Sequence, residues 1–485
     1  MKASKPATDI SVSFRDPSGR LLRASGRILR LINRDGVADL EAFLNSSTFQ
    51  RLLETKRLVR TTMLDSAAVD NLIRDCEAAE LFELDDGWII AEHEQIPFQS
   101  FPYEWPPEML HEAARLTLDL AESLVAESLG LKDATPYNIL FRGPDPVFVD
   151  VLSFERRNPN DPIWLPQAQF ERTFLLPLLV NKQFRVELSQ LLSSRRDGLE
   201  PEDVYRLCGP LRKLSPPFLS LASIPTWLGA RHDKDDTTIY HSKTLSNPEK
   251  ARFILESSLK RLRRKLDRLR PRADEKSRWS DYMASDNNYT EQHFRAKQDF
   301  IEKALLEFRP ASLLDIGCNT GHFSAIAARS GARVVAIDSD EVVVGETWRR
   351  ARAEHLDVLP LVVNLARPSP AMGWRNRECA SFLDRARGAF DAVMMLAVIH
   401  HMLVSERIPL EEIIELAAEL TNDILMIEFI APEDSMFRRL ARGREHLHEG
   451  LTPQLFEAVC KRRFELIRSQ HLDETSRWFY LLRKR

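Results

Sequence analysis

From about residue 286 onward, short apolar segments alternate with segments of helical periodicity. The runs "SLLDIGC", "RVVAIDSD", "LDVLPLVVN", "FDAVMMLAVIHH" and "DILMIEFIAP" read as nearly continuous apolar strands. Residues 322–331 and 409–420 are spaced as helices. Buried strands separated by helices are typical of a parallel sheet covered on both faces. "RFELIRSQHL" and "RWFYLLRKR" predict an antiparallel edge, so we expect an α/β doubly wound domain over 286–485.

The first 230 residues show a mixed pattern. "GRLLRASGRILRLI" predicts two short strands around a Ser-Gly turn. Apolar spacing predicts a helix over residues 107–130, opened by Pro107 and closed by Gly130. "DPVFVDVLSFE" at 145–155 reads as one buried strand. We therefore expect a separate α+β domain over 1–230.

Residues 231–285 read as a linker that contains a basic amphipathic helix. Five leucines are spaced four or three residues apart: Leu255, Leu259, Leu262, Leu266 and Leu269. Eight Lys or Arg stand against one Asp over residues 260–272. The simplest interpretation is a helix packed on a neighbouring domain. Contact of residues 255–272 with a membrane surface or an acidic partner is the alternative.

Composition excludes several classes of protein. The chain has 485 residues and a formal net charge of −4, which argues against bulk nucleic-acid binding. Its five cysteines contain no CxxC pair, so neither a disulfide framework nor a zinc ribbon is expected. Neither a signal peptide nor an apolar run long enough to span a membrane is evident, so a cytoplasmic location is expected.

The segment "LLDIGCNTGHF" at 313–323 is the strongest candidate for a ligand-binding loop, at the carboxyl end of a strand. It has Gly317 and Gly321 but lacks both the GxGxxG fingerprint and a GK[ST] ending. A carboxylate at Asp315, directly before the turn, would repel a pyrophosphate. A cationic cofactor without phosphates, such as S-adenosylmethionine, has no such conflict. Asp338 ends the next strand and can accept hydrogen bonds from ribose hydroxyls, and Asn364 could bind an adenine edge.

In this order, "LLDIGCNTGHFS", "VVAIDSD", "VVNL" and "FDAVMMLAVIHH" resemble the motifs of class I S-adenosylmethionine-dependent methyltransferases. The resemblance implies a Rossmann-like sheet of seven strands with an antiparallel edge. It also implies close backbone approach to the cofactor at the glycine loop, and a leading helix near the cofactor. The cofactor-binding residues that it implies are Asp315, Gly317, Cys318, Asn319, Gly321, Asp338, Ser339, Asn364, Leu396, Tyr289 and Lys297. For Lys297, an ordinary surface lysine is the alternative.

Methyl transfer to a hydroxyl or amine can require a general base. His401 and His400 are the first candidates, because they end the predicted fourth strand. Glu428, in the fifth strand, is the third candidate. For each of these residues, the alternative is a structural role, in core packing or in bracing a loop. We assign no metal, since no set of ligands with suitable spacing is evident.

A second resemblance lies upstream, in "LKDATPYNILFRGPDPVFVDVLSFE". The spacing of Asp133, Asn138 and Asp150 is similar to the catalytic loop and metal-binding Asp of kinase-like and aminoglycoside-phosphotransferase-like folds. Leu131 stands where a His is expected, and neither a Gly-rich loop nor a VAIK-like lysine is evident. The resemblance implies a degenerate kinase-like domain, with Mg-ATP as an optional second cofactor.

The blocks "SFPYEW", "LKDATPYNILF", "PSPAMGW", "AVIHHM" and "IPLEEI" resemble a group of large bacterial methyltransferases that includes rhizobial nodulation host-specificity proteins. We therefore expect methyl transfer to an unidentified acceptor, through O or N, with a glycan, lipid or small metabolite as candidates. Two alternatives remain. One is a phosphotransferase or nucleotide-binding regulator that uses the methyltransferase domain as a sensor, and the other is a non-catalytic scaffold.

Overall fold

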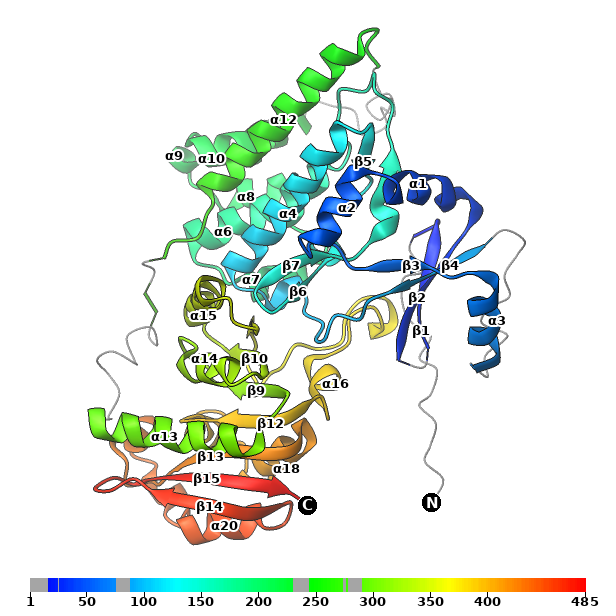
Figure 1. The fold of residues 1–485 in the computed structure, drawn as a ribbon. Helices are drawn as coiled ribbons and strands as arrows, with labels where there is room; N and C mark the ends of the chain where they lie inside the picture. Colours follow the sequence, from blue (N-terminus) through cyan, green and yellow to red (C-terminus); the bar gives the residue numbers. More distant parts are fainter. Residues whose placement is uncertain (1–15, 25, 76–87, 230–243, 274–275, 278–289) are drawn as a thin grey trace.

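The computed structural model describes residues 16–24, 26–75, 88–229, 244–273, 276–277 and 290–485. Its C-terminal half is built on a seven-stranded sheet in the order β11-β10-β9-β12-β13-β15-β14 (Figure 1). The five strands from β11 to β13 in this order run parallel, and β14 runs in the same direction. β15 lies between β13 and β14, runs in the opposite direction and pairs antiparallel with both. The strands are β9 (Ser312–Ile316), β10 (Arg333–Asp338), β11 (Val358–Val362), β12 (Phe390–Met395), β13 (Thr421–Ile430), β14 (Phe464–His471) and β15 (Arg477–Lys484).

Helices cover this sheet on both faces, as the alternating pattern predicts. Phe300, Ile301 and Phe323, from α13 and α14, belong to one core cluster with Leu313 and Val334 of the sheet. The other face carries α16, α18 and α20. The helices of this half are α13 (Glu291–Phe308), α14 (His322–Arg329), α15 (Glu341–Glu354), α16 (Phe382–Ala386), α17 (Ile399–Val404), α18 (Leu410–Leu420), α19 (Ser435–Ala441) and α20 (Pro453–Cys460).

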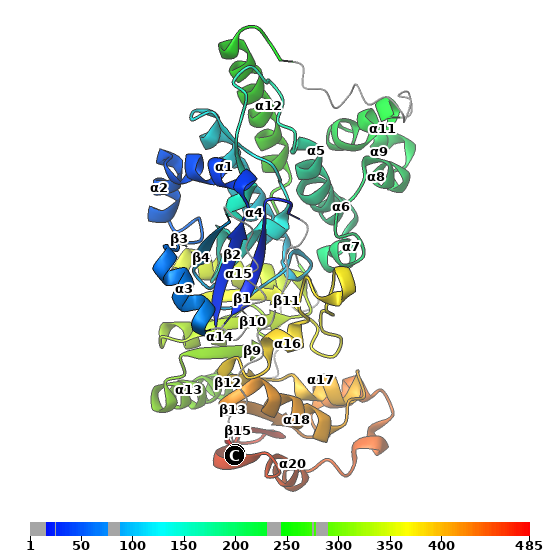
Figure 2. The same ribbon diagram turned by 90° about the vertical axis from the view of Figure 1, so that its right-hand side faces the viewer.

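The N-terminal half combines a small antiparallel sheet with a group of helices (Figure 2). The sheet has the order β1-β2-β4-β3. The strands of this half are β1 (Gly19–Ala24), β2 (Arg27–Ile32), β3 (Thr61–Met63), β4 (Ile89–His93), β5 (Leu129–Leu131), β6 (Ile139–Arg142), β7 (Asp145–Phe148) and β8 (Phe154–Arg156). The helices are α1 (Arg34–Leu44), α2 (Ser47–Glu54), α3 (Ser66–Asp75), α4 (Pro107–Val125), α5 (Gln167–Phe170), α6 (Leu176–Phe184), α7 (Leu188–Ser194), α8 (Pro201–Leu207), α9 (Pro210–Lys213), α10 (Pro216–Phe218) and α11 (Ile224–Gly229).

Two predicted elements of this half are wrong in detail. The helix predicted over 107–130 ends at Val125, because Gly130 belongs to β5 and pairs with Glu155 of β8. The strand predicted over 145–155 is interrupted, because the chain leaves β7 after Phe148 and makes a short 3₁₀ turn before β8. The predicted hairpin is confirmed, as β1 and β2 pair antiparallel.

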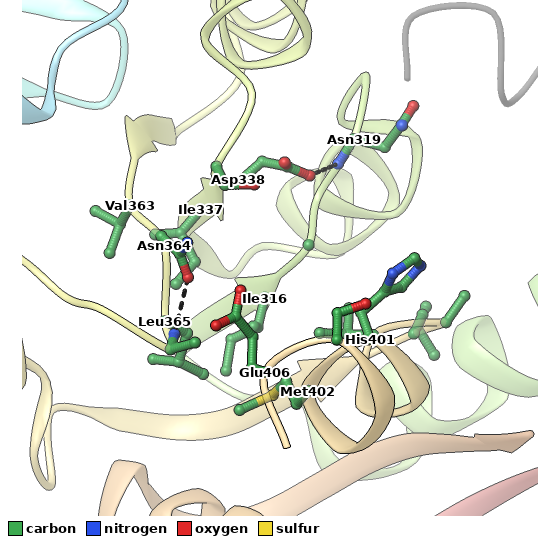
Figure 3. A pocket seen from close by; sticks show the side chains of 17 residues that line it. Ile316, Asn319, Ile337, Asp338, Val363, Asn364, Leu365, His401, Met402 and Glu406 are labelled. Carbon is green, nitrogen blue, oxygen red and sulfur yellow. Dashed lines mark hydrogen bonds between the residues drawn. The ribbon is translucent and has the colours of Figure 1, made fainter. Parts of the chain in front are cut away.

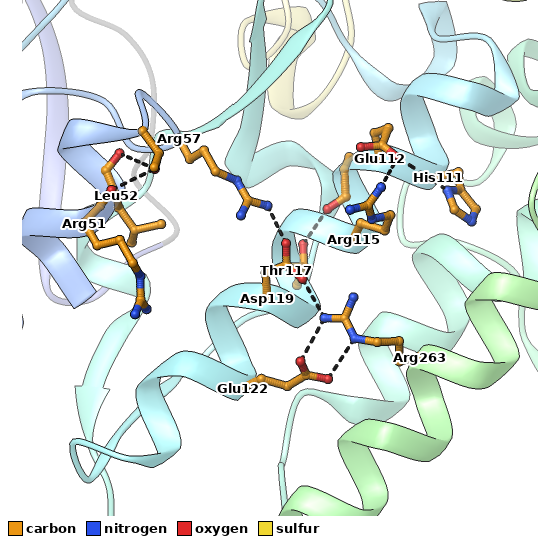
Figure 4. Close-up of polar contacts among 12 residues, drawn as sticks. Arg51, Leu52, Arg57, His111, Glu112, Arg115, Thr117, Asp119, Glu122 and Arg263 are labelled. Carbon is orange, nitrogen blue, oxygen red and sulfur yellow. Dashed lines mark hydrogen bonds and ion pairs between the residues drawn. The ribbon is translucent and has the colours of Figure 1, made fainter. Parts of the chain in front are cut away.

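The basic helix α12 (Pro248–Arg268) packs lengthwise on α4. All five leucines of its stripe are buried. Arg263 donates hydrogen bonds to Asp119 and Glu122, and Asp119 also pairs with Arg57 (Figure 4). The leucine stripe of α12 is therefore covered by the N-terminal half. In the described part of the chain, no helix is long and apolar enough to cross a bilayer.

The two halves share a core, and α15 is the main helix between them (Figure 1). The rings of Phe98 and Phe390 lie 5.7 Å apart within one continuous apolar cluster. The Trp348 indole of α15 donates a hydrogen bond to the Pro144 carbonyl. Ion pairs between the halves include Arg349–Glu108, Arg352–Asp145 and Arg385–Glu104. Because α15 directly follows β10, contacts from the N-terminal half reach the edge of the sheet where ligands bind.

Candidate active site

A pocket of about 270 Å³ opens where the parallel strands end (Figure 3). It lies at the switch point of the sheet, since β9 is followed by β10 on one side and neighboured by β12 on the other. Six of the predicted cofactor residues line it: Gly317, Asn319, Asp338, Ser339, Asn364 and Leu396. His401 lines it from α17. The structure thus brings together residues from four separate strand ends.

The glycine loop requires two residues without side chains. Gly317 has a φ of +75°, and a Cβ atom there would lie 2.3 Å from the Val398 Cγ2 atom. Gly321 has a φ of +73°, and its Cβ would lie 2.6 Å from Thr347 Cγ2. The Gly317 N–H donates to the Ile337 carbonyl at 2.8 Å, which fastens the loop to β10. Both glycines are therefore required by the close packing of the loop against Val398 and Thr347, and Gly317 also lines the pocket.

Asp338 anchors the pocket at the end of β10. One carboxylate oxygen accepts a hydrogen bond from the Asn319 N–H at 3.0 Å (Figure 3), and the other accepts from the Asp340 N–H at 3.1 Å. Burial raises the pKa of Asp338 to about 6, although these N–H groups oppose the rise. A ligand hydroxyl that donates to the carboxylate would favour its ionised form.

Asn364 closes the pocket beyond the end of β11. Its Oδ1 accepts from the Ala366 N–H at 3.0 Å, which makes a tight turn through Leu365. Val363, Leu365 and Ala366 give this end of the pocket an apolar wall beside the Asn364 amide. A flat base with a polar edge suits such a wall.

Four predicted cofactor residues lie outside the pocket lining. Asp315 is buried in β9, its carboxylate accepts from the Ser324 hydroxyl at 2.5 Å, and burial raises its pKa to about 7. Cys318 is buried, and Gly321 is the N-cap of α14. The fourth of these residues is Lys297, which pairs with Glu428. Tyr289 lies outside the described residues. Asp315 thus braces α14 and does not face the pocket, so the predicted repulsion of a pyrophosphate has no geometric support.

The position predicted for His400 and His401 is wrong, although both residues are near the pocket. β12 ends at Met395, and Ala397, with a φ of +55°, turns the chain into α17. His401 faces the pocket (Figure 3), while His400 is 2% exposed. Their rings lie 4.2 Å apart. Burial, assisted by the neighbouring positive side chains, lowers the pKa of His400 well below its usual range, so this ring is neutral.

Glu428 lies in a buried network of charges and away from the pocket lining. Its carboxylate pairs with Lys297 Nζ at 2.7 Å and with Arg477 Nη1 at 3.4 Å. Arg477 also pairs with Asp434 at 2.9 Å. Lys297 is 5% exposed, which excludes the surface-lysine alternative. This network joins α13, β13 and β15.

Sequence reasoning missed the side chains of α17 that complete the wall. Val398, Met402 and Ser405 line the pocket with His401. Their spacing of three or four residues is that of one helical face. The signal was present in "AVIHHMLVSE", but reading this segment as the end of a strand concealed it. The pocket is also lined by Ile316 and Ile337 at strand ends, by Leu365 and Ala366 in the turn after β11, and by Glu406 after α17.

The structure brings together the three residues of the predicted N-terminal site, Asp133, Asn138 and Asp150. An ion pair with Arg30 neutralises the charge of Asp150. Asp150 pairs with Arg30 Nη1 at 2.8 Å and accepts from the Ser153 hydroxyl, which also accepts from Asn138. Burial and the nearby Asp150 carboxylate raise the pKa of Asp133. Over the described ranges, no group of three or more His, Cys, Asp or Glu side chains could hold a metal ion. Arg30 supplies the positive charge that magnesium would bring, so the geometry gives Mg-ATP no support.

Comparison with known proteins supports the C-terminal interpretation. Residues 289–471 match the family described as methyltransferase domain. Nodulation protein NoeA of Rhizobium meliloti (strain 1021) is 27% identical over 475 residues, which cover 97% of this chain and 95% of the relative. Ubiquinone biosynthesis O-methyltransferase of Caulobacter vibrioides (strain ATCC 19089 / CIP 103742 / CB 15) is 31% identical over 107 residues, 22% of this chain and 37% of the relative. The crystal structure of N-methyltransferase NodS from Bradyrhizobium japonicum WM9 aligns with a TM-score of 0.31 at 14% identity, covering 41% of this chain and 98% of that chain.

Proposed function

Because this chain carries a class I S-adenosylmethionine-dependent methyltransferase domain, we propose that it methylates an oxygen or nitrogen atom of an acceptor bound beside His401. The carrying observation is the pocket itself, where Asp338 and His401 face one cavity from opposite walls. Glycans, lipids and small metabolites are the acceptor classes that we propose to test. The similarity to a nodulation protein along nearly the whole chain supports a product that acts in nodulation.

We assign the cofactor's parts to the pocket by their chemistry. Asp338 accepts from the ribose hydroxyls, because an ionised carboxylate is acceptor-only. The Asn364 turn binds the adenine, and the loop at Gly317 and Asn319 approaches the methionine part. The cofactor supplies a methyl group on a sulfonium that leaves readily, so the chain's own task is to position the acceptor and to exclude water. Leu396 and Val398 supply the apolar wall for that task.

His401 is the best candidate for a general base, since it is the candidate whose ring lines the pocket. His400 stays neutral and packs against the His401 ring, which makes it a positioning residue. Glu428 is engaged by two cations and is not needed as a base.

We expect His401→Gln to lower kcat about a hundredfold and to leave the Kd for S-adenosylmethionine within about twofold, because general-base catalysis contributes in this range. The Kd is measured by calorimetric titration, and kcat by transfer of labelled methyl groups once an acceptor is found. Met402→Leu, on the same face of α17, is the matched control for packing. An unchanged kcat in His401→Gln would remove this residue from the proposed chemistry.

The raised pKa of Asp338 predicts that cofactor affinity depends on pH. Below about pH 6 the free carboxyl is protonated, and binding must then release that proton. The affinity for S-adenosylmethionine should therefore fall roughly tenfold for each pH unit below 6, and should level off above it. Titrations from pH 5 to about 8 measure this slope. In Asp338→Asn, the remaining affinity for S-adenosylmethionine should no longer fall below pH 6. In His401→Gln, the affinity should keep the pH dependence of the wild type.

The decisive experiment uses the whole chain with labelled S-adenosylmethionine and fractionated cell extracts. Separate lipid, saccharide and small-metabolite fractions are incubated with the wild type and with His401→Gln. Label that enters one fraction with the wild type and not with the variant supports the proposal and identifies the acceptor class. Failure of the wild type to bind S-adenosylmethionine would overturn it and would favour the scaffold alternative.

A further inference from the structure

The short helices α8 to α11 carry a concentration of exposed apolar side chains. Of the fifteen large hydrophobic residues that are exposed in the described ranges, six fall within residues 207–228. Their exposed fractions run from 39% to 88%, in Leu207, Leu211, Leu214, Ile224, Trp227 and Leu228. A soluble protein rarely leaves so many large apolar side chains close together without a partner. We call this set the apolar surface of α8–α11.

This surface is the outer side of a packed unit, and the helices beneath it are well formed. Val204, Phe218 and Leu221 are buried on the inner side. The Trp227 indole N–H donates to the Tyr205 hydroxyl at 3.2 Å, which joins α11 to α8. In Figure 2, α8, α9 and α11 form a projection beside α6 and α7, at a distance from the seven-stranded sheet. The exposed residues therefore lie on helices that are packed together, away from the pocket.

The charges closest in sequence to the exposed apolar residues are mainly positive. Residues 204–229 contain Arg206, Arg212 and Lys213 but neither Asp nor Glu. The Arg212 guanidinium lies 4.7 Å from the Phe184 ring centre, and Lys213 Nζ lies 3.8 Å from that of Tyr205. Three cations thus border leucines and a tryptophan, and α8 adds two acids, Asp203, which pairs with Arg195, and Glu202, whose carboxylate lies beside Gly229.

We infer that the apolar surface of α8–α11 binds the surface of an anionic lipid bilayer. Leucine and tryptophan side chains insert at the boundary between headgroups and acyl chains, and Lys and Arg are attracted to anionic headgroups. The leucine stripe of the basic helix α12 cannot supply this contact, because it is buried against α4. The inference is independent of the methyl acceptor, although a membrane location would bring the enzyme to lipid-linked acceptors.

The test is sedimentation of the full chain with vesicles of phosphatidylcholine alone and of phosphatidylcholine mixed with phosphatidylglycerol. We expect binding to the mixed vesicles, weakened by salt. Leu211→Ser combined with Leu214→Ser should weaken it about tenfold or more, since two large apolar groups are removed. Arg212→Gln combined with Lys213→Gln should weaken binding to the mixed vesicles by about tenfold. Phe253→Ser, at a residue 71% exposed on α12, is the matched control and should bind as the wild type does.

Three outcomes would overturn the inference. The first is no binding of the wild type to either vesicle, and the second is undiminished binding by the Leu211/Leu214 variant. The third is self-association in light scattering that this variant abolishes, because the surface would then be an interface between two copies. Binding of S-adenosylmethionine by the Leu211/Leu214 variant, measured in parallel, verifies that the chain is folded. This readout also separates failure of the membrane contact from failure of the proposed function.

Discussion

Asp338→Ala should weaken the binding of S-adenosylmethionine at least about hundredfold. The carboxylate is the proposed acceptor for the ribose hydroxyls, and each hydrogen bond to a charged group contributes about 1.5–3 kcal/mol. Two such bonds correspond to a hundredfold change in Kd or more. The substitution also frees the N–H groups of Asn319 and Asp340, which the carboxylate now holds. Calorimetric titration of the full chain measures the effect directly.

The control for this variant is Asp384→Ala on α16, which removes an acid that is 57% exposed and lies outside the pocket lining. It should bind the cofactor as the wild type does. Asp338→Asn separates charge from shape, because the amide retains one acceptor and loses the charge. Asp338→Ala with wild-type affinity would contradict the assignment of the ribose to the end of β10.

Glu428→Gln should lower the free energy of unfolding by about 3 kcal/mol or more. The substitution leaves the buried cations Lys297 and Arg477 without their shared carboxylate, and an uncompensated buried charge is costly. Urea unfolding followed by circular dichroism measures the change. If Glu428 were instead a general base, the variant would remain as stable as the wild type and lose only kcat.

The matched control is Glu291→Gln, in the first turn of α13. Its partner Arg295 is 2.5 Å away, but the two side chains are 81% and 73% exposed. Exposed pairs of this kind contribute little, so the unfolding midpoint should not move measurably. Equal losses in both variants would show that burial of the Glu428 network is not what stabilises the domain.

The elements that could be predicted from the sequence are those whose signal is local. The apolar strands and the φ of Gly317 follow from short stretches, because a tight turn after a buried strand needs particular residues at particular positions. Asp338 and Asn364 follow for the same reason, since each directly ends a strand or follows one. The antiparallel edge of β14 and β15 was likewise predicted from two short strand-like segments near the end of the sequence.

What could not be predicted depends on contacts far apart in the chain. Lys297 resembles a surface lysine until Glu428, 131 residues later, is placed beside it. The leucine stripe of α12 predicts a buried face but does not identify the element that covers it. That element is α4, which lies about 140 residues earlier and has no sequence feature that indicates the pairing. Asp150 similarly resembles a metal-binding acid until its ion pair with Arg30 is known. The sequence near either residue does not indicate this pair.

The position of α15 bears on whether the two halves are modules that can be separated. Its Thr347 hydroxyl donates to the Asn319 carbonyl of the glycine loop, while its Trp348 indole is held by the Pro144 carbonyl of the other half. A fragment that begins after the linker would keep every pocket residue and lose the support of the helix that braces them. A gene fragment that encodes only this part would be a poor choice for building fusion proteins. Recombination between relatives should keep the two halves together rather than exchange one of them.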